Sequence, residues 1–169
     1  MIKNIFITGR PGCGKTTLIK EILEELKLNA GGFYTLEIQD NGVRKGFKII
    51  TLEGKKGILA HQNIKSSYRV SKYGVNMKDL EGIGVKSILD ALKENKIVVI
   101  DEIGKMELFS EKFKKIVEIA LDSKNKVLGT IKMTRDIFTD KIRKRADTKI
   151  FYLTRGNFQK VKEKIKKFL

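Results

Sequence analysis

The chain has 169 residues, with 36 Lys and Arg against 20 Asp and Glu, so its formal net charge is +16. A single cysteine, Cys13, excludes an intrachain disulfide and a Cys-rich zinc site, and a single histidine argues against a His-based metal cluster or a Ser-His-Asp triad. No apolar run approaches the roughly 20 residues of a membrane span, and the first residues show no signal-peptide pattern. We therefore expect a cytoplasmic, monomeric protein that forms one domain over residues 1–169.

Strand-like and helix-like segments alternate along the chain, which predicts an α/β fold with a mainly parallel sheet. Ile5–Ile7 is an apolar strand, and the apolar residues from Leu18 to Leu26 recur at helical spacing. We expect that helix to end before the Gly31-Gly32 pair. The segments 33–38 and 46–52 flank the turn sequence Asp-Asn-Gly and predict an antiparallel hairpin at the sheet edge. Together with the less legible residues up to 75, the hairpin forms an expected insertion over about 33–75.

The second half of the chain repeats the same alternation of helices and strands. Four consecutive β-branched residues, 97–100, are typical of a strand buried on both faces of a parallel sheet. The other predicted elements are a helix capped by Asn76, a helix capped by Ser110, strands at 127–131 and 150–153, and a last helix from about Asn157.

A phosphate-binding loop follows the first strand. The residues Gly9, Arg10, Pro11, Gly12, Cys13, Gly14, Lys15 and Thr16 match G-x-x-x-x-G-K-[ST] at every fixed position. Glycines let successive backbone N–H groups point inward as a nest for phosphate oxygens, and the following helix adds the positive end of its dipole. Lys15 is expected to reach the β- and γ-phosphates, the Thr16 hydroxyl to bind Mg²⁺, and Thr17 to contact the α-phosphate.

Two adjacent acids follow the most apolar strand, where ligand sites of open α/β sheets lie. Asp101 is the candidate partner of Thr16 in holding Mg²⁺, through water. Glu102 is the candidate general base for an attacking water. Glu107 lies nearby in sequence and either positions water or metal or simply begins the next helix, where acids are favoured.

The motifs together resemble the THEP-type nucleoside triphosphatases, a P-loop family also called the cancer-related nucleoside triphosphatases. The residues Asp101-Glu102-Ile103-Gly104-Lys105-Met106-Glu107-Leu108 are similar to the family's most distinctive block. The hairpin segments Gly32-Phe33-Tyr34-Thr35 and Gly46-Phe47 also resemble the family, as do Tyr73-Gly74-Val75-Asn76 and Gly129-Thr130-Ile131. The resemblance covers essentially the whole chain.

The resemblance implies a three-layer αβα P-loop fold and hydrolysis of ATP, GTP and other nucleoside triphosphates to the diphosphate and phosphate, with Mg²⁺ and little choice of base. It implies phosphate binding by residues 9–16, Mg²⁺ support by Asp101, catalysis by Glu102 and Lys15, and a nucleotide contact at Asn157. The chain departs from the family pattern at Leu36, at Lys132 and at Phe158, which stands where arginine is expected. Arg155 is the nearest residue that can replace that arginine.

Two alternatives remain open. A small-molecule or nucleotide kinase shares the P-loop, and the insertion over 33–75 would then serve as its lid. A nucleic-acid-binding ATPase would explain the positive charge. That charge is concentrated at the end of the chain, where residues 141–169 contain 11 Lys and Arg against 2 acids. We expect Lys160, Lys162, Lys164, Lys166 and Lys167 on the solvent side of the last helix, and Arg135, Arg143 and Arg145 on a helix that follows Thr130.

Overall fold

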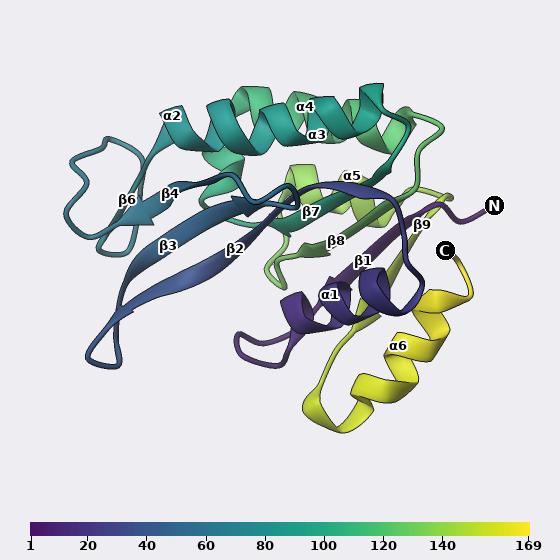
Figure 1. Ribbon diagram of the computed structural model, residues 1–169. Coiled ribbons are helices and arrows are strands. Elements are labelled where there is room, and N and C mark those ends of the chain that lie inside the picture. The colour runs from purple at the N-terminus through teal and green to yellow at the C-terminus, as the bar shows by residue number, and fades with distance from the viewer.

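Nine strands form one continuous sheet in the computed structural model, which describes residues 1–169 (Figure 1). The strand order is β5-β6-β4-β3-β2-β7-β8-β1-β9, and the five strands from β2 to β9 run parallel to one another. The strands are β1 (Asn4–Thr8), β2 (Ala30–Asp40), β3 (Val43–Thr51), β4 (Lys56–His61), β5 (Arg69–Val70), β6 (Tyr73–Val75), β7 (Ile97–Ile103), β8 (Val127–Ile131) and β9 (Thr148–Tyr152).

Helices cover both faces of the sheet and make the fold a three-layer αβα arrangement, as predicted (Figure 1). On one face α1 (Lys15–Glu25) and α6 (Phe158–Lys166) pack against the parallel strands. The other face carries α2 (Met77–Asp79), η1 (Leu80–Val85), α3 (Lys86–Lys93), α4 (Glu111–Asp122) and α5 (Ile137–Arg143), and two short turns of 3-10 helix are η2 (Glu107–Phe109) and η3 (Arg155–Asn157). None of the helices is long and apolar enough to cross a membrane.

The core lies in two layers because alternate residues of each central strand point to opposite faces. In β1, Phe6 joins the layer beneath α3 and α4, whereas Ile5 and Ile7 join the layer beneath α1 and α6. All three are fully buried. This packing fixes the carboxyl ends of β1, β7 and β8 at one edge of the sheet, where the loop and the two acids are located.

The inserted hairpin has the predicted turn but a different place in the sheet. Asn41 and Gly42 form its two-residue turn with φ of 48° and 75°, as a tight hairpin requires. However, the hairpin is not at the sheet edge, because β3 pairs onward with β4, and β4 with β6. Residues 54–75 therefore extend the sheet with short antiparallel strands rather than forming a lid over the P-loop.

The first helix ends earlier than predicted. It stops at Glu25, and the Gly31-Gly32 pair lies inside β2, opposite Val98 and Val99 of β7. The glycines therefore serve a close strand contact and not a helix terminus. The predicted caps Asn76 and Ser110 are confirmed, since each side chain accepts a hydrogen bond from the backbone N–H three residues on, at 3.1 and 3.0 Å.

Two further expectations about charged residues are wrong. Lys162 does not face solvent, because the residue is 6% exposed and its ammonium donates to Glu21 and Glu25 of α1 at 3.0 and 2.7 Å. Of the three arginines expected on one helix, only Arg143 lies in α5, which spans Ile137–Arg143. The salt bridges of Lys162 with Glu21 and Glu25 connect α6 to α1, which explains why this lysine is buried.

Candidate functional site

The P-loop connects β1 to α1 in the conformation that its glycines allow. Gly12 and Gly14 have φ of 77° and 99°, in a region that side-chain-bearing residues rarely adopt. Gly14 caps α1 without a side chain, so no side-chain cap occupies the N–H groups of the first helical turn. A helix start of this kind is an anion site, because the N–H groups and the helix dipole both favour negative charge.

Lys15 and Thr16 stand at the start of α1, on the concave side of the loop. The Lys15 ammonium donates to the carbonyl oxygens of Gly9 and Arg10, at 2.9 and 3.0 Å, and so spans the loop. The Thr16 hydroxyl donates to the Oδ2 atom of Asp101. Thr17 is exposed on the first turn. The structure thus brings Asp101 close to Lys15 and Thr16, although it lies 85 or more residues later in the sequence.

Asp101 is the centre of a buried hydrogen-bonded group. Its side chain is 4% exposed, and its second oxygen, Oδ1, accepts a hydrogen bond of 2.6 Å from the hydroxyl of Thr130, which is fully buried on β8. Burial raises the pKa of Asp101, whereas the hydrogen bonds from Thr130 and Thr16 and the charge of Lys15 oppose the rise. The parallel register of β7 and β8 makes this contact possible.

A hydroxyl and a carboxylate in contact supply the oxygen ligands that Mg²⁺ prefers. No group of three or more His, Cys, Asp or Glu side chains is arranged to hold a metal by itself. This is compatible with Mg²⁺ in particular, because that ion usually keeps several waters and binds through one or two protein ligands plus substrate phosphates. Thr16 and Asp101 therefore fit the role assigned to them from the sequence.

Glu102 and Glu107 add two more acids on the same side of the sheet. Glu102 is half-buried at the end of β7, and the 3-10 turn η2 holds Glu107, which is 3% exposed. Burial first, and the charge of Asp101 second, raise the pKa of Glu102. Burial also raises the pKa of Glu107 well above its ordinary value, with the charge of Glu102 adding to the effect. A carboxylate with a raised pKa is a better proton acceptor than an ordinary one.

A cavity of about 510 Å³ opens beside the P-loop. Arg10 and Cys13 line it from the loop, and it is also lined by Tyr152, the last residue of β9, and by Arg155 of η3. Asn157 does not line this cavity. Its side-chain amide instead stabilises the turn after β9. The amide oxygen accepts a hydrogen bond from the Thr154 N–H at 2.7 Å, and the amide nitrogen donates to the Tyr152 carbonyl at 2.9 Å.

The three arginines expected on one helix have separate partners in the structure. Arg145 pairs with Asp122 and Asp147, and Arg135 with Asp140. Arg143 is the exception, because its guanidinium donates to the carbonyl of Lys132 at 2.6 Å and leaves its buried Nη1 atom without a partner.

Comparison with known proteins agrees with this geometry. The family model described as NTPase matches residues 4–166. The chain belongs to this NTPase family. It is 56% identical over 153 residues to a nucleoside-triphosphatase THEP1 from Thermotoga sp. strain RQ2, covering 90% of this chain and 87% of that protein. It is 38% identical to a cancer-related nucleoside-triphosphatase homolog from Mus musculus, covering 93% of this chain and 91% of that protein.

Two solved structures of this NTPase family have the same fold. The crystal structure of THEP1 from Aquifex aeolicus superposes with a TM-score of 0.86 at 40% identity, covering 96% of each chain. The solution structure of a human cancer-related nucleoside triphosphatase gives a TM-score of 0.82 at 35% identity, covering 96% of this chain and 95% of that one. The resemblance inferred from the sequence motifs is therefore confirmed.

One residue of the site escaped the sequence reasoning. Thr130 belongs to the segment Gly129-Thr130-Ile131 that resembles the family. Its neighbours in the sequence, however, did not indicate that its hydroxyl donates a hydrogen bond to the carboxylate of Asp101. A polar residue within a buried apolar strand was the available signal, because a buried hydroxyl needs a partner.

Proposed function

We propose that the protein is a Mg²⁺-dependent nucleoside triphosphatase of the cytoplasm that hydrolyses ATP, GTP and other nucleoside triphosphates to the diphosphate and phosphate. The observation that carries this proposal is the convergence of Lys15, Thr16, Asp101 and Glu102 at one edge of the sheet. Family membership supports it, because the relatives named above are nucleoside triphosphatases.

The residues divide the reaction among them. Backbone N–H groups of the loop and the Lys15 ammonium hold the β- and γ-phosphates, and Thr16 and Asp101 would hold Mg²⁺, which neutralises charge on the phosphates when bound. Glu102 accepts a proton from water as the water oxygen bonds to the γ-phosphorus. The bond from that phosphorus to the β–γ bridging oxygen then breaks, and the nucleoside diphosphate leaves with the electron pair.

The side chains that line the cavity beside the P-loop support broad base tolerance. Its walls carry the planar groups of Tyr152, Arg10 and Arg155, all of which can stack on a base. Stacking is tolerant of base identity, because every base has a π-face. We therefore assign this cavity, with Arg10 on its wall, to the nucleoside, and we assign Cys13 as a neighbour of the phosphates.

The test is a phosphate-release assay with ATP, GTP, CTP and UTP, with and without Mg²⁺ and with no acceptor present. Hydrolysis of all four with Mg²⁺ supports the proposal, a strict single-base preference contradicts its breadth, and no release without an acceptor favours a kinase.

Glu102→Gln should lower kcat by about 10²- to 10⁴-fold, since it removes the general base. Glu118→Gln, the same change on the exposed face of α4, is the control. An unchanged rate in Glu102→Gln would show that Glu102 is not the base.

A further inference from the structure

A second large cavity, of about 580 Å³, lies at the same edge of the sheet as the P-loop. The nucleoside cavity is lined by the P-loop and by residues at and after the end of β9, whereas this one is lined by segments that follow β7 and β8 and by β5. The two cavities have no lining residue in common. Nothing in the proposed hydrolysis uses the second cavity, and its size is within the range of about 300–1,000 Å³ that small-molecule sites occupy.

Cationic side chains line this cavity with little compensation. Arg69, Lys105, Lys114 and Lys132 contribute to its walls, against one acid, Asp136. Only Lys132 has an ion pair inside the cavity, at 2.7 Å from Asp136.

The other three cations keep most of their charge available. Lys105 is exposed and forms no ion pair within 4.0 Å. Arg69 donates only to the neutral carbonyls of Ile64 and Lys72, which hold its guanidinium in place without cancelling its charge. Lys114 reaches Glu111 at 3.3 Å, but that carboxylate is 86% exposed, and pairs of this kind contribute little.

The rest of the wall is apolar and partly aromatic. Leu108, Phe109, Ile137 and Phe138 line the cavity. Ile137 is 81% exposed although it is a large apolar residue at the start of α5. Phe109 packs against the ring of Tyr68, at 5.5 Å between centroids. A planar apolar body would cover this surface and remove it from water.

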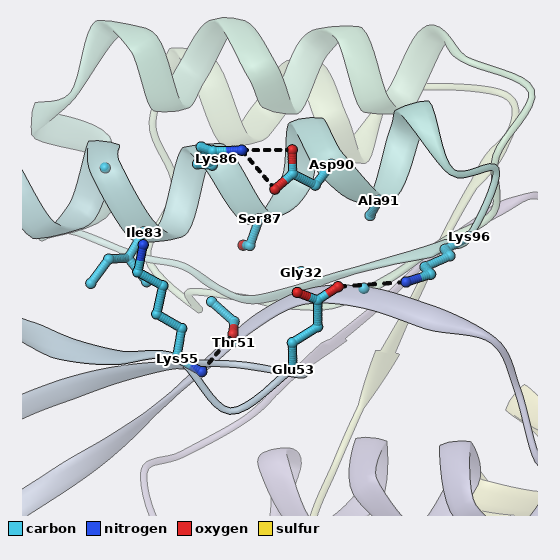
Figure 2. Close-up of a pocket in the computed structure, with 12 residues that line it drawn as sticks. Gly32, Thr51, Glu53, Lys55, Ile83, Lys86, Ser87, Asp90, Ala91 and Lys96 are labelled. Atoms are coloured by element: carbon cyan, nitrogen blue, oxygen red, sulfur yellow. Dashed lines mark hydrogen bonds and ion pairs between the residues drawn. The ribbon is translucent and has the colours of Figure 1, made fainter.

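Another cavity of the protein differs in these properties. It lies at the opposite edge of the sheet, has a volume of about 210 Å³, and is shown in Figure 2. Most of its charges are paired, since Lys86 binds Asp90 at 2.9 Å and Lys96 lies 3.6 Å from Glu53, and only Lys55 has no ion pair (Figure 2). The cavity lined by Arg69 and Lys105 therefore carries a larger excess of positive charge than this one.

We propose that this cavity is a second ligand site, separate from the nucleotide site, for a small organic anion. The ligand has a planar apolar body, which rests on Phe109 and Ile137, and a phosphate, carboxylate or sulfonate group, which faces Lys105 and Arg69. The proposal concerns binding alone and is independent of whether the protein hydrolyses nucleotides.

Two fluorescent probes that differ by one charged group test the proposal on the full chain. The sulfonate 8-anilino-1-naphthalenesulfonate carries both features of the ligand, whereas N-phenyl-1-naphthylamine has the apolar body alone. Titrations are made with saturating Mg²⁺ and ADP, so that neither probe reports on the P-loop side. Lys105→Glu should weaken binding of the sulfonate about tenfold, as reversing a charge a few ångströms from an anion requires at a protein surface. The same change should leave the neutral probe within about twofold.

A second variant predicts a change of opposite sign. Asp136→Asn removes the only acid of the cavity and frees Lys132, so the sulfonate should bind about threefold or more tightly. The variant should fold normally, because Asn and Asp cap helices about equally well and Asp136 is the N-cap of α5. Lys124→Glu is the matched control, since it reverses an exposed charge at the other edge of the sheet, and it should change neither affinity.

Ile137→Glu tests the apolar wall and should weaken both probes, without loss of thermal stability, because the side chain is already exposed and an acid suits the first turn of a helix. Three results would overturn the proposal. They are no binding of the sulfonate at all, equal affinities in Lys105→Glu and Lys124→Glu, and an Asp136→Asn variant that binds the sulfonate no better than the unaltered protein.

Discussion

Thr130→Val tests whether the hydroxyl of β8 positions the carboxylate of Asp101. The substitution keeps the shape of the side chain and removes only the donor of the 2.6 Å hydrogen bond to Oδ1. Both groups are buried, with Thr130 fully enclosed and Asp101 4% exposed, so water cannot replace the lost donor. Asp101 would keep one partner, the hydroxyl of Thr16.

The expected cost follows from the kind of bond removed. A hydrogen bond to a charged group contributes about 1.5–3 kcal/mol, and an acceptor left unpaired in the interior adds its desolvation penalty. For a chain of this size each kcal/mol lowers Tm by about 2–4 °C, so we expect Tm to fall by about 3–12 °C. Because outer partners of metal-binding side chains typically contribute about 10- to 100-fold, the Mg²⁺ concentration for half-maximal phosphate release should rise by that factor.

Thr130→Ser separates the hydroxyl from the methyl group. It keeps the donor and loses one buried methyl, worth about 1 kcal/mol, so it should lose some stability but keep the Mg²⁺ requirement of the unaltered protein. Urea unfolding and phosphate release at varied Mg²⁺ give both quantities for each variant. If Thr130→Val matches Thr130→Ser in its Mg²⁺ requirement, Thr130 does not position Asp101 and the reasoning fails.

Two further predictions concern a close backbone contact and a buried acid. Gly32→Ala places a Cβ 2.0 Å from the Val99 carbonyl oxygen at a φ of 110°, so it should cost about 3 kcal/mol or more in urea unfolding. Gly42→Ala also has a positive φ, of 75°, but no clash, so it should cost only about 1–2 kcal/mol, and equal losses would refute the close-contact explanation. Glu107→Gln should raise Tm at neutral pH, because burial and the charge of Glu102 hold the folded-state pKa of Glu107 above its unfolded value. The wild type is most stable below pH 4.5, where Glu107 is protonated, and it loses stability as the pH rises and the buried carboxyl must ionise. The difference in Tm between Glu107→Gln and the wild type should therefore increase from pH 4.5 to pH 8, and a constant difference would contradict this account.

The sequence was sufficient to predict an α/β fold with a mainly parallel sheet and the phosphate loop, since both depend on local patterns. Helical and strand periodicities indicated the alternation, and the family resemblance added the three αβα layers. The spacing from Gly9 to Thr16 identified a loop in which the glycines adopt positive φ. The caps Asn76 and Ser110 were equally local, because each bonds a backbone group three residues away.

The errors involve contacts between residues that are far apart in sequence. The Gly31-Gly32 pair is typical of a helix end, but the Cα of Gly32 packs against the backbone of Val99, 67 residues later in the chain. The sequence pattern of α6 places Lys162 on its solvent face, yet its ammonium binds Glu21 and Glu25 of a helix more than 130 residues earlier. The contact of Thr130 with Asp101 depends in the same way on strand register. Local patterns carry no information about such partners.

The positive charge of the chain can now be assigned to particular places, and its distribution favours small anions over a nucleic acid. Part of the basic last helix is neutralised, because Lys162 and Lys166 bind acids of α1 and α6. At the edge of the sheet that carries the P-loop, the cations instead line two separate concave cavities, with Arg10 and Arg155 in one and Lys105 in the other. A continuous nucleic-acid strand needs a groove that follows its backbone, whereas two separate cavities of this size suit small ligands. We therefore expect the positive charge of the chain to attract nucleotides, and we expect small anions in the two cavities.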